Sequence, residues 1–189
     1  MNPSMTAAAG LADAKRPVLS YWPAALGLAA ATFQIVTGVA TDAVAITVTV
    51  AACCYLAAAA LGRPWIAWAG IPAGSVAVVL SEIAGIAWWQ GLAAFAVVLV
   101  VAGVVRRAPV RPFTAQILAL VGFGGLAVAA LLVNPRFGLA IAGTALAAHA
   151  AWDYVHWRRN AVVPRSLTEF CFVLDIPFGV AAIVMAITG

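Results

Sequence analysis

The residues of this chain best suited to chemistry lie in one short stretch, residues 149–159. It holds both histidines of the chain, His149 and His156, and one of its six acidic residues, Asp153. Successive residues of an α-helix are rotated by about 100°, so these three side chains fall within roughly 60° of one another on one face. Two imidazoles and a carboxylate form a ligand set that zinc accepts. The spacing therefore predicts a zinc-type metal site with His149, Asp153 and His156 as ligands.

A second carboxylate, Asp175, is predicted to reach the same site from the next helix along the chain. Cys171 and Asp175 are four residues apart, so they share a helix face. Pro177 cannot donate a backbone hydrogen bond, which predicts a freed carbonyl beside this carboxylate. We expect Asp175 to be a fourth metal ligand or a general base. Asp153 and Asp175 are thus the predicted catalytic residues, acting with a metal-activated water.

The composition of the chain is that of an integral membrane protein. Of its 189 residues, 66% are hydrophobic and only 8% are charged, and the mean hydropathy is +1.08. A soluble domain carries about 25% charged residues. The net charge of +4 does not predict nucleic-acid binding, because the basic residues form no cluster with interleaved polar residues. The expected partner is the lipid bilayer.

Seven apolar segments, separated by short polar or glycine-rich breaks, predict an all-α, seven-helix transmembrane bundle. They lie near Pro23–Ala40, Ala43–Leu61, Pro64–Ile83, Ile86–Val105, Phe113–Val133, Phe137–Trp157 and Thr168–Thr188. Residues 21–189 are expected to form one transmembrane domain, and residues 1–20 a short cytoplasmic tail. Two glycine patterns, at residues 70–74 and 122–125, predict close helix packing.

The basic residues predict how this bundle is oriented. With seven spans and a cytoplasmic N-terminus, nine of the ten basic residues fall on the cytoplasmic side, and only Arg136 falls outside. Cytoplasmic segments of membrane proteins are enriched in Lys and Arg. The pattern therefore favours a multi-pass protein of the plasma (inner) membrane with its C-terminus outside.

Ionisable residues inside the predicted spans are the informative ones, because each is costly in a bilayer unless it is paired or hydrated. There are six: Glu82, His149, Asp153, His156, Glu169 and Asp175. In the predicted topology all but Glu82 lie in the cytoplasmic half of the last two helices, with Gln116 at a similar level. Glu169 is expected to be a helix N-terminal acid or a partner of Arg165. The remaining four residues make up the predicted site.

These residues favour a metal-dependent enzyme that acts on a lipid-like substrate from the cytoplasmic leaflet. They also fit a proton-coupled carrier, in which a buried carboxylate and imidazole exchange protons. A third interpretation is an accessory subunit or scaffold whose polar groups seal contacts with other membrane subunits. Axial haem ligation by one histidine is a fourth and weaker interpretation. The sequence leaves open whether the chain is an enzyme.

Seven helices with an intramembrane His/Asp cluster resemble, in helix number and residue types, the ceramidase and progestin-receptor superfamily of zinc-dependent lipid amidases. The resemblance implies a zinc-activated water that cleaves a lipid amide or ester. Members of that superfamily use three histidines, whereas this chain has two, both in one predicted helix. The likeness is one of architecture.

Overall fold

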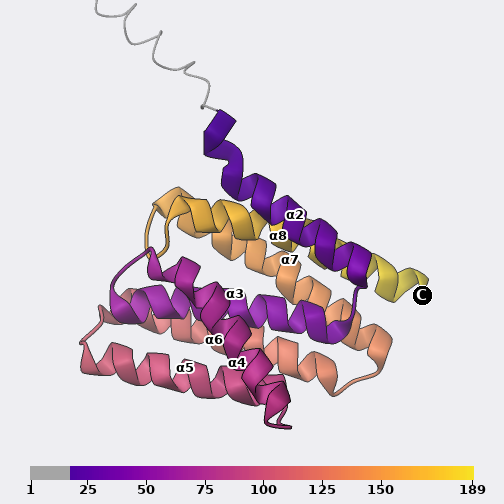
Figure 1. Cartoon of the computed structure of the whole chain (residues 1–189), viewed down its shortest axis with the longest axis horizontal. Coiled ribbons are helices and arrows are strands. Elements are labelled where there is room, and N and C mark those ends of the chain that lie inside the picture. Colours follow the sequence, from indigo (N-terminus) through magenta and orange to yellow (C-terminus); the bar gives the residue numbers. More distant parts are fainter. Residues whose placement is uncertain (1–17) are drawn as a thin grey trace, which may run out of the picture.

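The computed structural model describes residues 18–189, and this part of the chain is helical without any strand. A short 3₁₀ helix, η1 (Val18–Tyr21), leads into seven α-helices (Figure 1). They are α2 (Trp22–Thr37), α3 (Thr41–Leu61), α4 (Ile66–Ile83), α5 (Trp88–Val105), α6 (Val110–Leu131), α7 (Pro135–Arg159) and α8 (Arg165–Thr188). Each predicted apolar segment corresponds to one helix, so the all-α prediction is confirmed. The predicted tail, apart from residues 18–20 in η1, lies outside the described residues.

The helix ends follow local sequence signals. Pro23 and Pro135 lie in the first turns of α2 and α7, where a missing N–H breaks no helical hydrogen bond. α3 ends at Gly62, whose left-handed backbone (φ 65°) lets its N–H bond the carbonyl of Ala58. α7 runs two residues past its predicted end, to Arg159, before Asn160 takes a left-handed conformation. Short connections of this kind fold consecutive helices back onto one another.

α3 is the central helix of the bundle. It contacts α4, α5, α6, α7 and α8, and nearly all of its residues from Val44 to Ala60 are buried. Figure 1 shows it crossing the middle of the molecule, while α2 packs along α8 on one side. A helix that is apolar all round lies in the core of a protein or spans a membrane. The sequence of α3 fits this position, and its single tyrosine, Tyr55, is therefore held deep in the core.

The first of the two predicted glycine contacts is present, whereas in the second pattern only Gly124 meets another helix, with its Cβ position 3.7 Å from Thr49. A Cβ atom on Gly70 would lie 2.9 Å from the Cα atom of Cys54, so α4 packs tightly on α3 there. Gly122 and Gly125 have no atom within 4 Å of such a Cβ position, so the predicted close approach to α6 is wrong at these two residues. The prolines inside α4 and α8 do not end either helix. Pro177 therefore leaves α8 continuous beside Asp175.

Five helices, α3, α4, α5, α6 and α8, are long and apolar enough to cross a membrane. α2 is apolar but has only 16 residues. α7 is long enough, yet it is the least apolar of the seven because it carries the His/Asp stretch and two arginines near its end. These lengths and compositions indicate an integral membrane protein.

Candidate metal centre

The site is built on the contact between α7 and α8, the most extensive helix pair in the described chain. Gly143 and Gly179 lie where these helices approach most closely. A Cβ atom on Gly143 would be 2.8 Å from the carbonyl oxygen of Gly179, and one on Gly179 would be 2.8 Å from the backbone nitrogen of Ala147. Only glycine allows this backbone contact. It brings the polar faces of the two helices together between one and two turns away.

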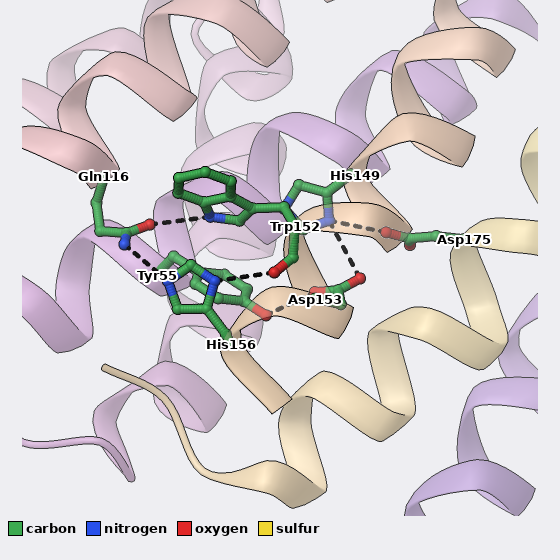
Figure 2. A network of polar contacts seen from close by, with 7 residues as sticks. All are labelled: Tyr55, Gln116, His149, Trp152, Asp153, His156 and Asp175. Carbon is green, nitrogen blue, oxygen red and sulfur yellow. Dashed lines mark hydrogen bonds and ion pairs between the residues drawn. The ribbon is translucent and has the colours of Figure 1, made fainter. Parts of the chain in front are cut away.

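His149 of α7 lies between two carboxylates. Its Nδ1 atom is 2.8 Å from Asp175 Oδ2 and 3.4 Å from Asp153 Oδ2 (Figure 2). The side chains of His149 and Asp153 are fully buried, and that of Asp175 is 1% exposed. One donor atom from each residue lies within 4.8 Å of the other two. Because imidazole nitrogen and carboxylate oxygen are common metal ligands, this trio can hold a metal ion.

Each member of the trio also has one buried polar atom without a hydrogen-bond partner. These atoms are His149 Nε2, Asp153 Oδ2 and Asp175 Oδ1. A buried donor or acceptor that is left unpaired costs about 1–3 kcal/mol, and more when it belongs to a charged group. One such atom on each of three neighbouring residues indicates a cluster whose bonding capacity is not met by protein groups alone.

Tyr55 orients one of the carboxylates. Its hydroxyl donates a hydrogen bond of 2.6 Å to Asp153 Oδ1, which leaves Oδ2 facing His149. The edge of the Tyr55 ring also contacts His149, with ring centroids 5.6 Å apart. Sequence analysis missed this residue, which lies 98 positions before Asp153. The sequence signal for it was a tyrosine within an apolar helix, where its hydroxyl must find a hydrogen-bond partner.

His156, the fourth predicted ligand, lies in a neighbouring network. Its Nδ1 atom is 2.9 Å from the carbonyl oxygen of Trp152, and its Nε2 atom is 3.1 Å from Gln116 Nε2. A carbonyl only accepts, so Nδ1 carries the proton and Nε2 accepts from the amide. Gln116 Oε1 in turn accepts from the indole of Trp152 at 3.2 Å (Figure 2). Both ring nitrogens of His156 are thus already used.

The helix geometry explains why His156 separates from Asp153. Asp153 and His156 are rotated by about 60° from each other and lie about 4.5 Å apart along the axis. In the bundle this difference turns Asp153 toward Tyr55 of α3, while His156 meets Gln116 of α6. Three of the four predicted ligands therefore meet, and Gln116, expected at this level, joins the second network.

Two pockets reach the trio from different sides. A pocket of about 310 Å³ between α7 and α8 is lined by Asp153, Tyr154, Trp157 and residues of the first turns of α8, including Glu169. A groove of about 360 Å³ is lined by residues of α2, α3, α4 and α8, with Asp175 among them. We call these the α7–α8 pocket and the α2–α4 groove. Each carboxylate of the trio thus borders its own opening.

Of the other predicted polar residues, Glu82 lies away from the trio, and Cys171 lies one helical turn before Asp175. Glu82 is exposed at the end of α4, consistent with its exclusion from the site. Cys171 is buried and borders the α2–α4 groove with Asp175 and Cys54. All three cysteines are free thiols.

Comparison of the chain with protein-family models, with curated proteins and with solved structures finds no match. The described residues form an all-helical bundle whose apolar helices indicate a membrane protein, with a buried His/Asp trio that can hold a metal ion. The resemblance to zinc-dependent lipid amidases gains no support from these comparisons.

Proposed function

We propose that this protein is a multi-pass protein of the plasma membrane that binds a divalent metal ion, zinc in the first place, at His149, Asp153 and Asp175. The single observation that carries the proposal is the convergence of three buried donor atoms within 4.8 Å, each on a residue with one unpartnered polar atom. The proposed fold has all seven helices crossing the bilayer, with a cytoplasmic N-terminus. Support for this orientation comes from the basic residues, nine of ten of which then face the cytoplasm.

Distances in the trio are compatible with a metal ion as well as with a hydrogen-bonded ion pair. Ligand atoms bound at about 2.0–2.1 Å to a tetrahedral zinc ion are about 3.3 Å apart. The separations of His149 Nδ1 from the two carboxylate oxygens, 2.8 and 3.4 Å, bracket this value. A slight outward shift of Asp175 would admit the ion.

The charges of the two aspartates also support a bound metal ion. Two ionised aspartates in an apolar interior are costly unless cations balance them. In the part of the chain that the structure describes, His149 is the cationic partner within 4 Å of both Asp153 and Asp175. Zinc with two carboxylates and a neutral imidazole would be charge-balanced.

Three protein ligands would leave one zinc position for water, which is the arrangement of catalytic zinc sites. We propose that this water is used to hydrolyse an ester or amide of a lipid-like substrate. With zinc bound, the oxygen of such a water would add to the carbonyl carbon, the carbon–oxygen or carbon–nitrogen bond would break, and the leaving alcohol or amine would take up the water's proton. Asp175, whose Oδ1 atom has no hydrogen-bond partner, is the proposed carrier of that proton. Asp153, held by Tyr55, remains a ligand throughout.

The test is the metal content of the protein purified without a histidine tag. We expect about one zinc ion per chain in the wild type and a loss of most of it in His149→Ala. His156→Ala is the matched control, because it removes the same side chain from the same helix but outside the trio. Wild-type protein without stoichiometric metal, or equal loss in both variants, would contradict the proposal.

A proton-linked carrier is the second candidate, and one observation favours it. Asp153 borders the α7–α8 pocket and Asp175 borders the α2–α4 groove, with His149 between them. Such a row could pass a proton from one opening to the other. Metal-free protein in liposomes would then conduct protons, as measured with an internal pH-sensitive dye, and Asp153→Asn would abolish the flux. An unchanged flux in Asp153→Asn would exclude the carrier.

A further inference from the structure

We propose that the α2–α4 groove binds the acyl chain of a membrane lipid, with the polar end of the chain beside Asp175. This inference names the substrate class of the proposed metal centre, and in that respect it rests on the proposed function. The occupation of the groove by a lipid is a separate property that is measured without metal or turnover.

The mouth of the groove opens on an apolar outer surface. Phe33 of α2 borders it and is 67% exposed, and Ser75 of α4 is exposed on the other side. Neighbouring residues of the same helices, such as Val36 and Val76, are large, apolar and more than half exposed. In a membrane protein such faces contact acyl chains rather than water. A lipid chain therefore lies next to this opening at all times.

Aromatic contacts join the N-terminal ends of α2, α4 and α8. Trp68, near the start of α4, has its ring centroid 5.3 Å from that of Trp22, at the start of α2. The Trp68 ring lies equally close to Phe170 of α8, and its indole donates a hydrogen bond to Ser166. Ala30, on the groove wall, is about 12 Å further along α2 than Trp22, at 1.5 Å per residue. The part of the groove bordered by Ala30 therefore lies further along α2 than these aromatic contacts.

The polar atoms of the groove favour a ligand with one polar group on an apolar chain. The hydroxyls of Thr47 and Ser75 donate to carbonyls of their own helices, and Gln34 donates to Thr47. Asp175 Oδ1 is the bordering atom that is buried without a partner. A peptide or sugar would need many hydrogen-bond partners. An acyl chain needs none along its length, and a donor group at its polar end would pair with the Asp175 carboxylate.

Photo-crosslinking tests the proposal on the full chain in liposomes, with a phosphatidylcholine that carries a diazirine in one acyl chain as the probe. We expect labelled peptides from the groove-lining parts of α2 and α8. Ser75→Trp places a large ring at the mouth and is expected to lose most of this label. Ala73→Trp is the matched control, because Ala73 is exposed on α4 but does not border the groove. Equal groove labelling in the two variants would overturn the inference.

A second pair of variants covers the case in which Ser75→Trp does not fold. Ala30→Phe narrows the groove from α2, whereas Ala29→Phe adds the same ring to an exposed position outside it. Only Ala30→Phe should lose the label. Label spread evenly over the outer faces of all helices would show ordinary lipid contact and would contradict the inference. Bound zinc without groove labelling would overturn the lipid site alone, and groove labelling without zinc would overturn the metal centre alone.

Discussion

The hydroxyl of Tyr55 lies 2.6 Å from Asp153 Oδ1, and this bond joins the central helix α3 to the site on α7. Partners of this kind fix the orientation of a metal ligand and are often as important as the ligand itself. Tyr55→Phe removes only the donor. We expect a drop of about 10–100-fold in zinc affinity, measured by competition with a chelator.

The same substitution leaves a buried carboxylate oxygen without a donor, which costs about 1–3 kcal/mol of stability. Tyr154→Phe is the control, because Tyr154 is exposed and its hydroxyl meets only Arg158, at 3.3 Å. We expect that change to be neutral within about 0.5 kcal/mol. Unaltered zinc affinity in Tyr55→Phe would show that Tyr55 does not position Asp153.

Metal removal should destabilise the wild type. An ion that binds only the folded chain adds about 2.7 kcal/mol of stability at a free concentration 100 times its Kd. A chelator removes this contribution and leaves Asp153 and Asp175 facing each other across His149. We therefore expect a lower midpoint of thermal unfolding in detergent after chelation.

Asp175→Asn should make that midpoint insensitive to the chelator, because the variant lacks a ligand and one buried negative charge. Glu82→Gln removes an exposed carboxylate elsewhere and should respond as the wild type does. An equal response of all three proteins would argue against a metal at the trio.

Gly143 and Gly179 set the distance between α7 and α8, so their substitution should loosen both the fold and the site. The Cβ atom of Gly143→Ala would lie 2.8 Å from the Gly179 carbonyl oxygen. Overpacking of this kind costs about 1–3 kcal/mol. Thermal unfolding and zinc content are both expected to fall.

Gly125→Ala is the matched control, because no atom lies within 4 Å of its Cβ position. An alanine there should stabilise α6 by about 0.5–1 kcal/mol through the lower entropy of the unfolded chain. If both alanine variants behave alike, the α7–α8 contact does not limit stability.

The proposed orientation predicts that the C-terminus lies outside the cytoplasm. Alkaline phosphatase fused after Gly189 should be active, because it folds only outside, and a fluorescent protein fused there should be dark. Fusions in the α4–α5 connection should give the same result as those at the C-terminus. The opposite pattern at either position would contradict the proposed orientation or the proposed number of spans.

The sequence was sufficient to predict the seven helices and the polar stretch of α7. Apolar runs of about 20 residues and the prolines at helix starts are local signals, and each helix can be recognised without knowledge of its neighbours. The meeting of His149, Asp153 and Asp175 was also within reach, since consecutive helices joined by a short connection pack side by side.

Other features depended on contacts between distant segments. The bond from Tyr55 to Asp153 and the one from Gln116 to His156 join helices that no pattern in the sequence pairs. His156 shares a helix face with His149 by angle, yet a rotation of about 60° from Asp153 is enough to direct it to a different neighbouring helix. Which helix occupies that side is decided only when the bundle packs.

The sequence by itself determined that this chain is an all-helical, strongly apolar protein with His, Asp and Asp on adjoining helices, because composition and periodicity are carried by each segment alone. The tertiary structure decided which of the polar residues form one site, which are satisfied elsewhere, and which openings reach the site. Those outcomes depend on how far each helix is rotated and how closely Gly143 and Gly179 allow α7 and α8 to approach.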